Sequence, residues 1–140
     1  NKGLLLVAEP SIIGDVSFNR SVVLLAEYNN ENGSVGFILN KPLEYMLKDF
    51  LPEISSRLPV YNGGPVEQVN LYFIHKIPEL IPGSIEISNG IYWGGDFNAI
   101  SELLRDDKLT QDQIRFFLGY SGWATEQLDQ ELDLNSWVVV

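Results

Sequence analysis

The chain contains no cysteine and only one histidine, His75, among its 140 residues. Without cysteine it can form no disulfide, no thiolate nucleophile, no Cys-ligated zinc site and no iron–sulfur cluster. One histidine also cannot supply the two or more imidazole or thiolate ligands that a transition-metal site usually has. We therefore expect no metal centre and no cofactor.

Long hydrophobic runs are absent as well. The apolar stretches at 4–8 and 22–26 are far shorter than the roughly 18 residues that a membrane-spanning helix needs, and they are typical of buried strands. The residues given carry no secretory signal. We expect a cytoplasmic protein with no membrane partner.

Basic residues are few. Nine Lys and Arg face nineteen Asp and Glu, which gives a net charge of −10. Nucleic-acid binding draws most of its affinity from Lys and Arg contacts with phosphates, and the nine basic residues are scattered along the chain. Direct binding of DNA or RNA by this chain is therefore disfavoured.

The residues that are present predict one globular domain over 1–140. Hydrophobic residues make up 45% of the chain, charged residues make up 20%, and no linker, repeat or low-complexity tract interrupts it. Helices are expected over 43–50, from Asp96 as N-cap to about 105, and over 125–132. Strands are expected over 3–9, 21–28, 35–39, 58–62, 70–76, 84–88, 91–93, 114–120 and 136–140.

Turn signals indicate how these strands pair. Asn89-Gly90 separates two short strands and is the strongest hairpin signal in the chain, because a type I′ turn needs positive φ at both central positions. The turn at 29–33 predicts a second hairpin. Strands and helices are interspersed without regular βαβ alternation. The sequence therefore predicts an α+β fold with a largely antiparallel sheet.

The stretch from Gly119 to Trp123 resembles a nucleophile elbow, in which a strained turn carries a serine between two glycines. Ser121 is correctly spaced from Gly119, but Trp123 stands where the second glycine belongs. The only candidate base is His75. We therefore favour a structural role, in which the glycines allow close backbone approach and Trp123 fills the core behind the turn.

Three further features have both a structural and a functional interpretation. His75 lies in an apolar strand, where bonding to a backbone carbonyl or a half-exposed position on the sheet is favoured over general-base catalysis. The acidic residues of the last predicted helix, among them Glu131, are interpreted as a solvated face or, alternatively, as a docking surface for a basic partner. Arg20 follows Asp15 in the preceding loop, and it either anchors that loop through an ion pair or offers a guanidinium to an anionic ligand.

Five short blocks follow one another along the chain: Gly-Leu-Leu-Leu-Val-Ala-Glu-Pro at 3–10, Arg-Ser-Val-Val-Leu-Leu at 20–25, Gly-Phe-Ile-Leu-Asn-Lys-Pro at 36–42, Gly-Gly-Pro-Val at 63–66 and Phe-Leu-Gly-Tyr-Ser-Gly-Trp at 117–123. Together they resemble the YqgE/AlgH family of bacterial proteins. The chain departs from that family at Tyr28, where histidine is frequent, and at Ser121, where alanine is common. Family members also extend some tens of residues beyond the position of Val140, so a C-terminal element of the family is expected to be missing.

The resemblance implies an α+β domain whose bifurcated sheet curls into a pseudo-barrel, with about three flanking helices. It implies little about function, because the family has no established biochemical activity. Some members carry the label of transcriptional or translational regulator.

From the residues and the resemblance together, we expect a non-catalytic cytosolic binding or regulatory domain that acts through a protein partner or a small ligand. Binding residues concentrate in loops at the ends of elements, so the expected ligand-facing positions are Arg20, Asn40, Lys41 and His75. No catalytic residue is assigned. The alternatives are a hydrolase that uses His75 or Ser121 and, disfavoured by charge, a regulator that binds nucleic acid directly.

Overall fold

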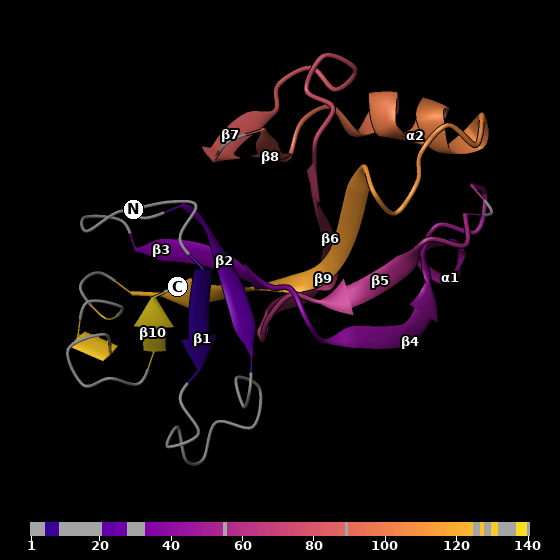
Figure 1. Cartoon of the computed structure of the whole chain (residues 1–140). Helices are drawn as coiled ribbons and strands as arrows, with labels where there is room; N and C mark the ends of the chain where they lie inside the picture. The colour runs from indigo at the N-terminus through magenta and orange to yellow at the C-terminus, as the bar shows by residue number, and fades with distance from the viewer. Residues whose placement is uncertain are drawn as a thin grey trace.

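The structure is a computed structural model, and it describes residues 5–8, 21–27, 33–54, 56–88, 90–124, 127, 130–131 and 137–139. This part of the chain contains ten strands and two helices (Figure 1). The helices are α1 (Leu47–Phe50) and α2 (Phe97–Arg105). The strands are β1 (Leu5–Ala8), β2 (Val22–Glu27), β3 (Ser34–Ile38), β4 (Pro42–Met46), β5 (Pro59–Asn62), β6 (Val66–His75), β7 (Ile85–Ser88), β8 (Ile91–Trp93), β9 (Ile114–Trp123) and β10 (Trp137–Val139).

The sheet branches at β9. Its main path runs β10-β1-β2-β3-β9-β6-β8-β7, while β5 pairs with β9 beside this path and β4 pairs with β5. Every pair is antiparallel except β5 with β9, which is parallel. The predicted α+β class with a largely antiparallel, bifurcated sheet is confirmed.

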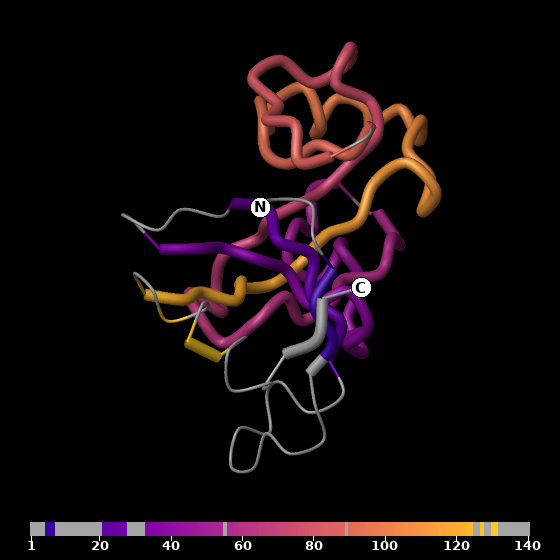
Figure 2. Tube along the Cα trace, turned by 60° about the vertical axis from the view of Figure 1, so that its left-hand side comes forward, coloured from indigo at the N-terminus to yellow at the C-terminus, as the bar shows by residue number. Residues whose placement is uncertain are grey.

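The sheet also curls, so that β7 at one end of the strand order approaches β2. Ile87 of β7 lies in one buried cluster with Leu24 of β2, Phe37 of β3 and Phe117 of β9. Figure 2 shows the pink-to-orange segment that carries β7, β8 and α2 above the indigo and purple N-terminal strands. This curl produces a half-barrel, in agreement with the curled sheet of the pseudo-barrel that the family resemblance implied.

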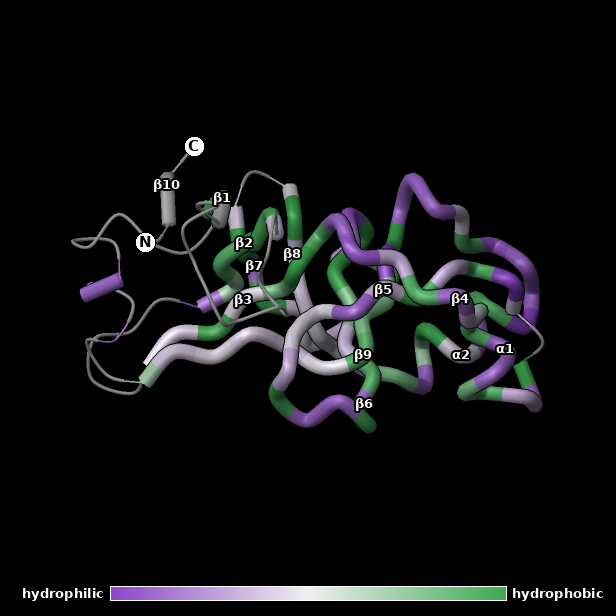
Figure 3. The backbone as a smooth tube through the Cα atoms, turned by 90° about the horizontal axis from the view of Figure 1, so that it is seen from below, coloured by the Kyte–Doolittle hydropathy of each residue, from purple (hydrophilic) through white to green (hydrophobic). Residues whose placement is uncertain are grey.

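A second core lies on the opposite face of β9, against the two helices. Ile114 and Phe116 join Leu47 of α1 and Ile100 of α2 in this cluster, whereas Phe117 belongs to the first cluster. The alternation follows from the two-residue period of a strand. Along the backbone, hydrophobic stretches run through the central strands, and hydrophilic stretches gather in the loops near β4 and α1 (Figure 3).

Helix α2 begins and ends where the sequence predicts. The Asp96 side chain accepts a hydrogen bond from the Asn98 N–H at 2.9 Å, which is the predicted N-cap. The helix ends at Arg105, so Asp106 and Asp107 lie beyond its negative C-terminal end.

Two local predictions were wrong. Residues 42–46 form strand β4 rather than helix, and only Leu47–Phe50 is helical. Pairing with β5 holds this segment extended, and Met46 is exposed rather than part of a buried helical stripe. The Gly119–Trp123 stretch is likewise not a strand-to-helix turn, because β9 continues through it and pairs with β3. Of the third predicted helix, 125–132, only residues 127, 130 and 131 lie within the described part of the chain, and these are helical.

Candidate functional site

His75 ends strand β6 and is 1% exposed. Its Nδ1 accepts a hydrogen bond from the Ile77 N–H at 3.2 Å, so the neutral ring carries its proton on Nε2. Nε2 lies 3.2 Å from the Gly94 carbonyl oxygen and 3.0 Å from Ser84 Oγ. Since the Ser84 hydroxyl donates to the Ile81 carbonyl at 2.6 Å, Oγ accepts from the imidazole. Both ring nitrogens are therefore used within the fold.

This arrangement holds His75 in its neutral form. Burial lowers the pKa of His75, and the hydrogen bond to the Gly94 carbonyl opposes that effect only in part. The Ser84–His75 pair resembles a serine–histidine dyad, but the hydrogen bond between the two side chains runs in the direction opposite to that of a catalytic dyad. A base must accept the hydroxyl proton, whereas here the imidazole donates and the hydroxyl proton is bonded to a carbonyl. The predicted carbonyl bond of His75 is confirmed.

Ser121 lies inside β9 and is fully buried. Its hydroxyl donates to the Gly63 carbonyl at 3.1 Å, and within the described residues it has no other hydrogen-bond partner. Trp123 is also buried, and its Nε1 donates to Glu131 Oε1 at 3.2 Å. The structural role predicted for Ser121 and Trp123 is confirmed, whereas the interpretation of Glu131 as a purely solvated residue was wrong.

The other predicted ligand-facing residues lie in two places. Asn40 and Lys41 connect β3 to β4. The Asn40 Oδ1 accepts from the Val22 N–H at 2.9 Å, and the Lys41 carbonyl accepts from the Asn62 N–H at 2.8 Å. Arg20 lies outside the described residues.

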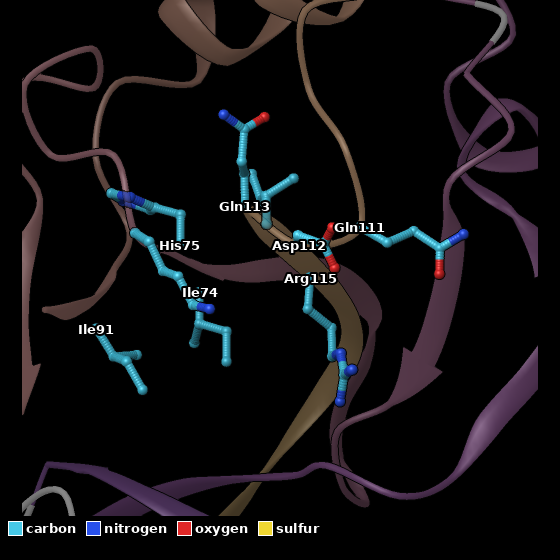
Figure 4. Close-up of a pocket in the computed structure, with 9 residues that line it drawn as sticks. Ile74, His75, Ile91, Gln111, Asp112, Gln113 and Arg115 are labelled. Carbon is cyan, nitrogen blue, oxygen red and sulfur yellow. The ribbon is translucent and has the colours of Figure 1, made fainter.

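A cleft of about 250 Å³ lies beside His75, where the end of β6 meets the start of β9 (Figure 4). In Figure 4 the His75 ring is turned away from Arg115, so the imidazole forms one border of the cleft rather than its centre. The side chains that line the cleft are apolar or carry charges and amides: Ile74, His75, Lys76, Ile91, Gln111, Asp112, Gln113, Ile114 and Arg115.

Arg115 connects this cleft to the segment that carries Asn40 and Lys41. Its guanidinium lies 4.4 Å from the centroid of the Tyr61 ring, and its Nη1 donates to the Leu39 carbonyl at 3.1 Å. The structure thus brings two of the predicted residues close to a cationic residue that the sequence analysis overlooked. The available signal was an arginine between Ile114 and Phe116 in an otherwise apolar strand.

The described part of the chain offers neither a metal-binding cluster nor a membrane-spanning helix. No three His, Asp or Glu side chains gather there in a way that could hold a metal ion. No helix among those residues is long and apolar enough to cross a membrane.

The model of the AlgH-like family matches residues 5–140. The chain belongs to the AlgH-like family. A UPF0301 protein of Bacteroides fragilis is 44% identical over 141 residues, covering 99% of this chain and 70% of the relative. A UPF0301 protein of Chlorobium phaeobacteroides is 39% identical over 138 residues, covering 98% of this chain and 73% of the relative. The resemblance inferred from the sequence blocks is confirmed.

Two solved structures share the fold of this AlgH-like chain. The solution structure of AlgH from Pseudomonas aeruginosa has a TM-score of 0.79 at 23% identity, covering 99% of this chain and 75% of its own. The crystal structure of a protein from Corynebacterium diphtheriae has a TM-score of 0.78 at 24% identity, covering 99% of this chain and 74% of its own. At this identity the likeness concerns the fold alone.

Proposed function

We propose that this AlgH-like chain is a non-catalytic binding domain with a regulatory role, and that it takes a small organic anion in the cleft beside His75. The observation that carries the proposal is the cleft itself, in which Lys76 and Arg115 adjoin an apolar wall. Ligand sites in proteins usually combine apolar walls with a few convergent polar groups in this way.

The absence of catalysis is inferred from how the candidate groups are used. His75 has an acceptor or a donor bond at each ring nitrogen, and the Ser84 and Ser121 hydroxyls both donate to backbone carbonyls. A nucleophile needs a base that can accept its proton, and neither serine has one among the described residues. These groups support the fold around the cleft.

The chemistry of the ligand follows from the residues that line the cleft. Ile74, Ile91 and Ile114 offer a wall for a short apolar body, while Lys76 and Arg115 outnumber the carboxylate of Asp112. A volume of about 250 Å³ is slightly below the range of roughly 300–1,000 Å³ that is usual for ligand sites, so only a small molecule fits. We therefore favour a short aliphatic carboxylate, with hexanoate as a suitable probe.

A regulatory role requires that binding changes an interaction with a protein partner. The net charge of −10 disfavours direct contact with nucleic acid, so regulation through a protein is the better interpretation of the family label.

Binding can be tested by titrating the isotope-labelled protein with hexanoate and following backbone amide shifts. Saturable shifts at Lys76, Gln113 and Arg115 are expected, with weaker binding in Lys76→Gln. Lys108→Gln makes the same charge change outside the cleft and should bind like the parent chain. Equal shifts with hexylammonium, or none with hexanoate, would contradict the proposal.

The non-catalytic part has its own test. Hydrolysis of p-nitrophenyl acetate should stay at the buffer rate in the parent chain. Any activity that disappears in Ser84→Ala or Ser121→Ala would contradict the assignment.

A further inference from the structure

A second and larger cleft, of about 550 Å³, opens between the end of α2 and the segment that joins α1 to β5. Three buried residues of the helical core contribute to its lining: Ile54, Leu104 and Leu109. Arg57 comes from one side of the cleft, and Arg105 and Asp107 come from the other.

The two guanidiniums in this cleft form no ion pair with any residue that the structure describes. Within the described residues neither Arg57 nor Arg105 forms a hydrogen bond or an ion pair, although Asp107 lines the same cleft. This is conspicuous in a chain with more than twice as many acidic as basic residues. Two arginines against one carboxylate leave the cleft net positive, and guanidinium is the side chain best suited to bind phosphate or carboxylate oxygens in pairs.

The backbone beside Arg105 is fixed by the end of α2. The Lys108 N–H donates to the Leu103 carbonyl at 2.9 Å, and the Asp107 N–H donates to the Leu104 carbonyl at 3.1 Å. Together with the positive φ of Asp107, +54°, these bonds form a Schellman C-cap. Arg105 is therefore held in the last helical turn, with Asp107 in a conformation that few side chains adopt.

The backbone around Arg57 is fixed by α1. The Lys48 N–H donates to the Ser56 carbonyl at 2.7 Å, and the Leu47 N–H donates to the Leu58 carbonyl at 2.8 Å. Arg57 lies between these two anchored residues. Because both arginines start from fixed backbone, a ligand that binds them orders only the side chains, which lowers the entropic cost of binding.

We propose that this cleft binds a small phosphate monoester through Arg57 and Arg105. A monoester carries close to two negative charges at neutral pH. Two guanidiniums therefore match the charge of a phosphate monoester better than they match the single charge of a carboxylate ligand. The ester's apolar body lies against Ile54, Leu104 and Leu109. The site adjoins the cleft beside His75, since Gln111 lines both, but its two arginines belong to this cleft alone and the inference does not depend on the proposed function.

The direct test is a calorimetric titration of the whole chain with phenyl phosphate, at low salt and pH 7.5. Arg57→Gln and Arg105→Gln should each weaken binding by about tenfold or more, since each removes charge-assisted hydrogen bonds to the phosphate. Asp107→Asn should tighten binding several-fold, because it removes a like charge and asparagine tolerates the left-handed conformation. Lys108→Gln, which lies outside the cleft, is the matched control and should leave the affinity unchanged.

Two comparison ligands test separately the contribution of the phosphate group and that of the apolar body. Inorganic phosphate should bind more weakly than phenyl phosphate, because it has no apolar body, and phenol should not bind detectably. Undiminished binding in both arginine variants would overturn the assignment. So would a loss of phenyl phosphate binding in Lys76→Gln, because Lys76 belongs to the other cleft.

Discussion

A close approach between β9 and the segment that joins β5 to β6 is predicted to make Gly119 hard to replace. Gly119 has a φ of +76°, and a Cβ at this position would lie 2.5 Å from the Gly64 carbonyl oxygen and 3.0 Å from that of Val66. Gly94 is a matched control, with a φ of +71° and nothing within 4 Å of an added Cβ. Alanine therefore meets the same backbone strain at both positions but a steric overlap only at Gly119.

The expected losses of unfolding free energy follow from the backbone strain and the steric overlap. Left-handed backbone costs a non-glycine residue roughly 1–2 kcal/mol, which is all that Gly94→Ala should lose. Overlap with a fixed backbone adds about 1–3 kcal/mol, so Gly119→Ala should lose roughly 2–5 kcal/mol. Alanine also lowers the conformational entropy of the unfolded chain relative to glycine, which raises the free energy of unfolding. This gain is the same in both variants and cancels when they are compared.

Urea unfolding followed by tryptophan fluorescence and circular dichroism measures both free energies of unfolding. Gly119→Ala should unfold at clearly lower urea than Gly94→Ala. If the two variants lose the same stability, the close contact between β9 and the Gly64–Val66 segment does not constrain the fold as argued.

Two other predictions concern polar groups in the core. Ser121→Ala should lose about 0.5–1.5 kcal/mol of unfolding free energy in the same urea assay, because the Gly63 carbonyl keeps a bond from the Ile38 N–H; a loss beyond 3 kcal/mol would contradict this. For His75, burial lowers the folded-state pKa below the unfolded value of about 6.5. Below that pH the unfolded chain takes up a proton that the folded chain resists, so the stability attributable to neutral His75 is lost by up to about 1.4 kcal/mol per pH unit as the pH falls. Urea unfolding between pH 7.5 and 5 should show a steeper loss in the parent chain than in His75→Gln, and equal slopes would refute this.

Local signals in the sequence were sufficient to predict those elements whose conformation depends on residues close together in the chain. The β7–β8 hairpin follows from its turn residues, with Gly90 at a φ of +86°. Helix α2 begins at Asp96 because an aspartate there bonds a free N–H, and it ends before the two aspartates that oppose its dipole. These features needed no knowledge of the rest of the chain.

Long-range pairing explains what the sequence could not predict. The segment 42–46 has helical periodicity, but its pairing with β5 decides its conformation. The parallel pairing of β5 with β9 likewise joins strands far apart in the chain and has no local signal.

The candidate site was predicted only in part for the same reason. His75 was selected as the sole histidine, yet its partner Ser84 becomes a neighbour only through the fold. Arg57 and Arg105 converge from segments almost fifty residues apart, so neither residue stands out in the sequence.

We propose above that this AlgH-like chain binds a small anion in the cleft beside His75 without catalysing a reaction. The most direct test is the amide-shift titration with hexanoate, comparing the parent chain with Lys76→Gln and Lys108→Gln. We expect saturable shifts at Lys76, Gln113 and Arg115 that weaken only in Lys76→Gln. Shifts that are absent, or that respond equally to both substitutions, would contradict it.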